Sequence, residues 1–171
     1  MSNTNMSNTN MSNTNDNLNE DEILKFSPWN ENNRLIDKSK VLEILKQFEI
    51  EEPINDLDLY QRAFVHKSYI NKEVNVCNGK EVEIEPRPDN CLDLQQKSYE
   101  RLEYLGDAIL SATIASYLYE RFPDEDEGFL TKMRTKLVCK DSLGSLADKM
   151  GFGEYLIISK HVEERCNGRT S

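Results

Sequence analysis

Three carboxylates recur at helical spacing in one segment of the sequence, at Glu100, Glu103 and Asp107. On an α-helix, residues three, four and seven apart lie on one face, so these side chains form an acidic stripe. A set of hard oxygen ligands with no His or Cys nearby suits Mg²⁺, with Mn²⁺ as an alternative. The other reading is a solvated face, or one paired with bases of another helix. The residues alone leave both readings open.

The surroundings of the stripe favour a cleft or an interface over open water. Apolar residues cover most of the rest of this helix. Two like charges one turn apart cost about 3 kcal/mol at an effective dielectric constant near 20. Within the helix only Glu100 has a base at a neighbouring position, Lys97, whereas Glu103 and Asp107 have none. A raised carboxyl pKa, a base from another helix or a bound cation would each relieve the repulsion.

Basic residues follow the acidic helix, although the whole chain carries a net charge of −10. That charge argues against a nucleic-acid partner, because phosphate binding depends on Lys and Arg. From residue 130 to the last residue, however, eight bases outnumber five acids. Lys132, Arg134, Lys136 and Lys140 are therefore candidates for phosphate contacts, and a solvated helix face is the alternative reading.

The acidic segment resembles a known signature. Glu100–Leu110 reads ERLEYLGDAIL, and this resembles the signature of the ribonuclease III family almost letter for letter. Phe64–Tyr69, Glu127–Arg134 and Asn167–Arg169 resemble the family's flanking segments. The resemblance spans about Leu57–Arg169, and its wording is most similar to versions from large nucleocytoplasmic DNA viruses.

The resemblance implies an all-α endonuclease domain that dimerises through the signature helix and cuts both strands of double-stranded RNA with Mg²⁺. The products would carry 5′-phosphate and 3′-hydroxyl ends, and no small-molecule cofactor is needed. By residue match, Asp107 and Glu103 would be catalytic carboxylates, and Glu103, Asp107 and Glu100 would be the metal ligands. Glu100 would also lie nearer the RNA. Tyr104 would enter a pocket on the partner subunit of a homodimer, with plain core packing as the alternative.

The sequence departs from the family pattern after Asn167–Arg169. The family has a second pair of acids there, an Asp and a Glu three residues later, whereas no acid follows Glu164 in this sequence. We therefore expect a catalytic domain that is C-terminally incomplete, truncated before the last catalytic helix and without a double-stranded-RNA-binding domain. A catalytically inactive RNA-binding or dimerisation module is the alternative function.

Several elements must position the stripe. The pentapeptide Met-Ser-Asn-Thr-Asn occurs three times at the start of the chain, and residues 1–27 are expected to be a disordered Asn-rich tail. Residues 28–171 would form one domain.

Residues 71–96 lack helical periodicity and read as an inserted loop, although the alternation at 81–85 would suit a short strand if a partner existed. Helices are expected from Ser39 as N-cap to Phe48, at Leu57–Ile70 with His66 in a structural role, at Ser98–Arg121, at Leu130–Leu137, and from Asp141 or Ser142 to Met150, before Gly151.

Composition limits the class of protein. Seven glycines and five prolines in 171 residues favour helices over a turn-rich β-fold. No apolar run approaches a membrane span, and the start of the chain does not read as a secretory signal. Four well-separated cysteines read as free thiols rather than as zinc ligands. We expect an intracellular, cytoplasmic protein, in the host cytoplasm if the source is viral.

Overall fold

The structure is a computed structural model of the 171-residue chain, and it describes residues 25–72, 75–77 and 80–166. Residues 1–24 of the expected tail and the Asn167–Arg169 segment of the family resemblance lie outside this described part. Among the described residues, no helix is both long and apolar enough to cross a membrane.

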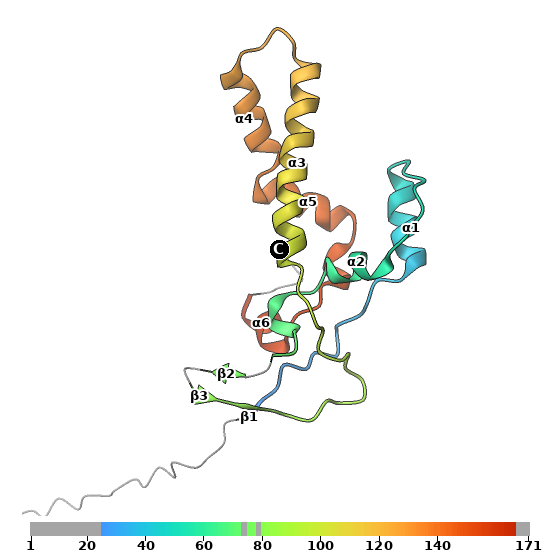
Figure 1. The fold of residues 1–171 in the computed structure, drawn as a ribbon, viewed down its shortest axis with the longest axis vertical. Helices are drawn as coiled ribbons and strands as arrows, with labels where there is room; N and C mark the ends of the chain where they lie inside the picture. Colours follow the sequence, from blue (N-terminus) through green and yellow to red (C-terminus); the bar gives the residue numbers. More distant parts are fainter. Residues whose placement is uncertain (1–24, 73–74, 78–79, 167–171) are drawn as a thin grey trace, which may run out of the picture.

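Helices dominate the described part, which confirms the predicted all-α class (Figure 1). The α-helices are α1 Lys38–Gln47, α2 Leu57–Arg62, α3 Glu100–Arg121, α4 Glu127–Leu137, α5 Lys140–Lys149 and α6 Lys160–Cys166, and the 3₁₀ turns are η1 Lys67–Tyr69 and η2 Phe152–Tyr155.

The longest helix, α3, closely follows its predicted bounds and ends two residues before Pro123. A short turn leads into α4, whose first turn is capped by the Asp126 carboxylate, which accepts a hydrogen bond from the Phe129 N–H at 2.8 Å. Figure 1 shows α3 and α4 side by side as a hairpin that projects from the rest of the molecule. Gly151 follows α5 with φ of 69°, the left-handed conformation predicted for the residue after that helix.

The helix predicted for Leu57–Ile70 was wrong beyond Arg62. His66 is extended, with φ −75° and ψ 148°, and it caps η1 instead of continuing α2. Tertiary pairing overrides the helical pattern here, because the Ile157 N–H donates to the Phe64 carbonyl and the His66 N–H donates to the Ile157 carbonyl, each at 2.9 Å. These bonds form a parallel bridge between Val65 and Ile157.

Two predicted helix caps were also wrong. Asp37 rather than Ser39 precedes α1, and its carboxylate accepts from the Lys40 N–H at 2.8 Å. Cys139, in an extended conformation, precedes α5 in place of Asp141 or Ser142. In both cases the helix begins earlier than its first apolar residue indicated.

Short strands join the start of the domain to the inserted segment. β1 (Lys25–Phe26) pairs in parallel with β4 (Glu83–Ile84), and β2 (Val76–Cys77) pairs antiparallel with β3 (Lys80–Glu81). Residues 25–27 were predicted to belong to the disordered tail, and for these residues the prediction was wrong. Backbone pairing and the burial of Pro28 order them. The alternating stretch 81–85 does have a partner strand. This partner is β1, whose residues the sequence analysis assigned to the tail.

Two groups of buried side chains form the core. The first lies under α1 and includes Ile36, Val41, Ile44 and Ile54. The second surrounds the Val65–Ile157 bridge and includes Tyr69, which is fully buried. Together they fix α2 and η1, the elements that meet the first turn of α3.

Candidate catalytic face on helix α3

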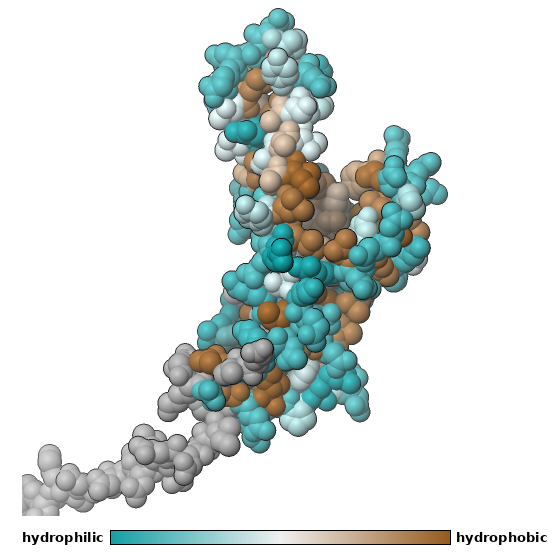
Figure 2. Space-filling model, in the orientation of Figure 1, coloured by the Kyte–Doolittle hydropathy of each residue, from teal (hydrophilic) through white to brown (hydrophobic). Residues whose placement is uncertain are grey.

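The three predicted carboxylates lie on α3, and all three are exposed. The sequence predicts a cleft or an interface for the stripe. In the described single chain the stripe does not lie in a cleft, and Leu118 is the one buried residue of α3. The reason is that α3 projects from the core, so its apolar side chains also reach solvent. Tyr104 is 83% exposed, and Leu105 and Ile109 are more than half exposed. In Figure 2, hydrophobic surface is visible along α3 on the side toward α1.

Lys67 of η1 supplies the countercharge for Glu100. Its Nζ lies 3.3 Å from Glu100 Oε1, and Ser98 Oγ donates to Glu100 Oε2 at 3.2 Å. The hydrogen bond from Lys67 is the main cause that lowers the pKa of the Glu100 carboxyl below its ordinary value. The predicted partner, Lys97, was wrong because α3 begins only at Glu100, so Lys97 is not one helical turn away from it.

The stripe does not gather all three carboxylates around one point. With a rise of 1.5 Å per residue, Glu100 and Asp107 are separated by about 10.5 Å along the helix axis. In the part of the chain that the structure describes, no group of three or more His, Cys, Asp or Glu residues is placed to hold a metal ion. Glu103 and Asp107, four residues apart, are close enough to face a common ligand, and so are Glu100 and Glu103, three residues apart. Their donor chemistry suits a hard cation that retains several waters, but two carboxylates make only part of such a site.

The first turn of α3 is fixed by the segment between α2 and η1. The Tyr99 N–H donates to the Val65 carbonyl at 2.8 Å, and Arg62 Nε donates to the Ser98 carbonyl at 3.0 Å. A pocket of about 380 Å³ lies beside this junction, lined by Ala63, Tyr99, Leu102 and Glu103. Glu103 is therefore at the edge of a concave surface. Sequence reasoning missed Arg62 and Lys67 because their roles depend on a contact far along the chain.

Three of the four candidate phosphate-binding residues lie on α4 but do not share one face, and the fourth, Lys140, begins α5. Lys132 and Lys136 are exposed and one turn apart. Arg134 is half-buried and lines a groove between α3 and α4, with Leu118 and Leu130. The structure thus brings together the two lysines and separates them from Arg134.

His66 has the structural role that its sequence context indicated, although on a cap rather than within a helix. Its Nδ1 accepts from the Ser68 N–H at 3.1 Å and lies 2.9 Å from Ser68 Oγ. Burial and, next, the positive charge of Lys67 lower the pKa of His66. Neutral His66 keeps Nδ1 available as an acceptor, which preserves this cap.

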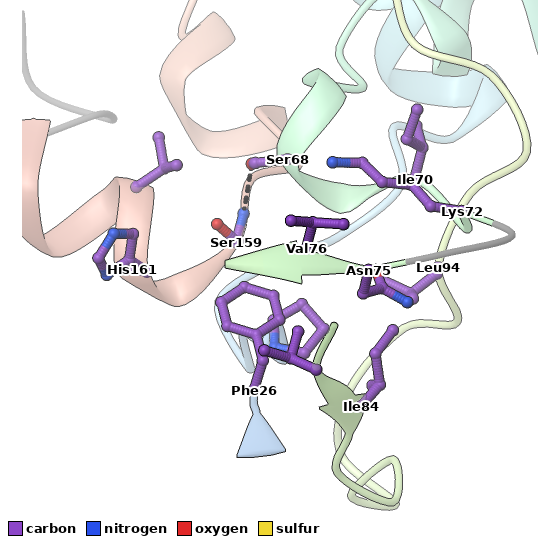
Figure 3. Close-up of a pocket in the computed structure, with 13 residues that line it drawn as sticks. Phe26, Ser68, Ile70, Lys72, Asn75, Val76, Ile84, Leu94, Ser159 and His161 are labelled. Atoms are coloured by element: carbon purple, nitrogen blue, oxygen red, sulfur yellow. Dashed lines mark hydrogen bonds between the residues drawn. The ribbon is translucent and has the colours of Figure 1, made fainter. Parts of the chain in front are cut away.

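A second cavity, of about 180 Å³, lies where β1, the inserted segment and the start of α6 meet (Figure 3). Phe26, Ile70, Val76 and Ile84 give it a mainly apolar lining. At its edge the Ser159 N–H donates to Ser68 Oγ at 3.0 Å. This cavity holds no carboxylate of the acidic stripe, so it is separate from the candidate catalytic face.

The fold and the site together define a class of protein. It is a helical domain in which a long helix with an acidic face is followed by a basic helix. Residues 100–170 match the Ribonuclease III domain. The chain thus carries a ribonuclease III domain over these residues.

The chain is similar to ribonucleases from a virus and from bacteria. It is 37% identical over 139 residues to a probable ribonuclease 3 of Acanthamoeba polyphaga mimivirus, covering 80% of this chain and 25% of that protein. It is 39% identical over 115 residues to ribonuclease 3 of Listeria welshimeri, covering 67% of this chain and 42% of that protein. Ribonuclease 3 of Staphylococcus aureus is 38% identical over 142 residues, covering 78% of this chain and 51% of that protein. The chain thus spans between a quarter and about half of the length of these relatives.

Two solved structures of the nuclease domain of ribonuclease III from Campylobacter jejuni share the fold. They match with TM-scores of 0.55 and 0.56 at 25% identity, and cover 77% and 79% of this chain and 73% and 71% of theirs. One of them shows structural flexibility in a region involved in dimer formation of that nuclease domain.

Proposed function

We propose that the chain is an Mg²⁺-dependent endoribonuclease that cleaves double-stranded RNA to 5′-phosphate and 3′-hydroxyl ends. The observation that carries the proposal is the exposed Glu103–Asp107 pair, one turn apart on the helix where the family match begins. A solvent-facing pair is open to a duplex, which is too wide to enter a closed pocket.

Glu103 and Asp107 are the side chains that would hold Mg²⁺ or Mn²⁺, and both would serve as catalytic carboxylates. When bound, the ion would lower the pKa of a water and stabilise charge on the phosphate. Glu100, at the end of the stripe that faces Lys67, would lie nearer to the RNA. Lys132 and Lys136 of α4 would contact phosphates outside the reacting centre, and Arg134 would support the groove beside them.

A second copy of the chain would cover the apolar part of α3. Tyr104, Leu105 and Ile109 are exposed together on this helix, and a symmetric dimer would bury each set against its equivalent. Each copy would bring one acidic face, so that both strands of a duplex are cut. The reaction requires no organic cofactor. A cytoplasmic site of action fits the free thiols of Cys91 and Cys139.

The alternative function is a non-catalytic module that binds duplex RNA or dimerises. It is favoured by the finding that no group of three or more His, Cys, Asp or Glu residues in the described part of the chain is placed to hold a metal ion. Such a module would retain the basic face of α4 and the apolar face of α3 without turning over RNA.

Incubation of the full chain with a long, end-labelled RNA duplex and Mg²⁺ tests the proposal. We expect cleavage of the duplex, no cleavage of either single strand, and products that accept ligation at their 5′-phosphate ends. The Glu103→Gln chain is the matched control. Duplex retention on a gel with equal, background turnover in both chains would favour the binding module instead.

A further inference from the structure

The cavity between β1, the inserted segment and α6 has a buried inner end and an exposed mouth. Pro28 and Ser159 line it and are both buried, so they belong to the inner end. Val76 also lines it and is 61% exposed. Lys72 and His161 are exposed lining residues as well. A ligand in this cavity would therefore have one end among buried groups and the other end near solvent.

The body of the cavity is apolar and holds about one ring. Phe26, Ile70 and Ile84 line it and are half-buried. Figure 3 shows Phe26, Val76 and Ile84 around one space, and they come from three different strands. The volume is about 180 Å³. An apolar protein cavity of roughly 150 Å³ is large enough for benzene, whereas pockets for drug-sized molecules begin at roughly 300 Å³. The size suits one aromatic ring or a short alkyl chain.

The charge of the cavity lining is opposite to that of the chain. The chain has 31 acidic and 21 basic residues, yet the described residues that line this cavity include Lys72 and His161 and no Asp or Glu. Figure 3 shows these two side chains on different sides of the cavity, Lys72 from the inserted segment and His161 from α6. Lys72 supplies a positive charge, and the His161 ring supplies an N–H donor. An anionic group at the mouth would meet complementary partners.

We propose that this cavity binds a small organic carboxylate with an apolar body. The body lies against Phe26 and Ile84, where its removal from water favours binding. The carboxylate stays at the mouth beside Lys72, which selects an anion over a neutral or cationic molecule of the same shape. The cavity contains no residue of the acidic stripe, so the inference does not depend on the proposed function. The bound molecule would connect β1, the inserted segment and α6.

Titration of the full chain with benzoate, followed through the methyl signals in two-dimensional NMR spectra, tests the proposal. We expect saturable shifts at Ile70, Val76 and Ile84 and none at Ile44, which lies in the core group under α1. The Kd should be on the order of 1 mM, because so small a ligand makes few contacts. Benzyl alcohol has the same ring without the charge and should bind about two- to fivefold more weakly. Acetate has the charge without the ring and should give no saturable shift.

Two variants separate the contribution of the charge from that of the space. Lys72→Met keeps an apolar stem and removes the ammonium group, so it should weaken benzoate binding about two- to fivefold and leave benzyl alcohol binding unchanged. Val76→Trp fills the mouth at an exposed position and should abolish binding of both molecules. Lys46→Met, at an exposed position of α1, is the matched control and should bind both as the wild type does. Circular dichroism verifies that each variant is folded.

The absence of a saturable benzoate shift in the wild-type chain would overturn the proposal. Equal affinities of the wild type for benzoate and benzyl alcohol would also overturn it, as would an equal loss of both in Lys72→Met, because either result shows that only the ring is recognised. Shifts at Ile44 as large as those at Ile84 would show non-specific binding and would contradict the assigned site.

Discussion

Ile157 stabilises the domain through both its side chain and its backbone. Its side chain is fully buried against Val65 and Tyr69, and its N–H and carbonyl bond to Phe64 and His66. The neighbouring Ile158 carbonyl accepts from the Asn33 side chain at 2.9 Å. This stretch therefore connects the start of the domain, the α2–η1 segment and α6.

Truncation of Ile157 should destabilise the chain strongly. We expect Ile157→Ala to lower the free energy of unfolding by about 2–5 kcal/mol, because it leaves a cavity, and Ile157→Val by about 0.5–1.5 kcal/mol. Urea denaturation monitored by circular dichroism measures both. Leu42→Ala, at a side chain that is 42% exposed, is the control. Equal losses for Ile157→Ala and Leu42→Ala would contradict the assigned core.

His66 should make stability depend on pH near neutrality. Its folded pKa lies below the ordinary value of 6.5, so the unfolded chain takes up a proton first as the pH falls. The free energy of unfolding should therefore decrease as the pH drops below about 6.5, until the folded pKa is passed. His66→Asn retains a side-chain acceptor for the Ser68 N–H but does not titrate. Denaturation at pH 7.5 and pH 5.5 should give a smaller loss in this variant, and an identical loss would refute the assignment.

At the scale of elements, the α3–α4 hairpin depends on local signals that the sequence displays. The Asp126 cap and the bounds of α3 follow from residues within a few positions, and the same is true of the left-handed Gly151 after α5. Asp126→Ala should cost about 0.5–2 kcal/mol of unfolding free energy through loss of the α4 cap. Asp124→Ala, in the same turn and with no hydrogen bond among those of the described residues, is the control. Equal thermal shifts in both variants would contradict the role of the cap.

Elements that depend on distant contacts escaped the sequence analysis. The break after Arg62 results from pairing with Ile157, and β4 exists because Lys25–Phe26 lies beside it. In the same way, the acidic stripe could be located from helical spacing, but its partner Lys67 could not. Helical periodicity reports which residues share a face and carries no information on which segment folds against that face.

At the scale of the whole molecule, the exposed α3 should set the oligomeric state. We expect Tyr104→Ala to weaken a homodimer by at least about 2 kcal/mol, the loss typical of a central aromatic residue in an interface. Tyr117→Ala, on another face of the same helix and 58% exposed, is the matched control. Sedimentation equilibrium over a range of concentrations measures both. A wild-type chain that stays monomeric at every concentration, or equal effects of the two variants, would contradict this interface.

The rate of duplex cleavage in Mg²⁺, compared between wild type and Glu103→Gln, tests the central claim most directly. Loss of a carboxylate that holds the ion should remove several kcal/mol of transition-state stabilisation, a decrease of about a hundredfold or more. Glu120→Gln, an exposed change on the same helix but outside the stripe, should retain the wild-type rate. Equal rates for wild type and Glu103→Gln would contradict the assignment of the acidic face of α3 as the catalytic site.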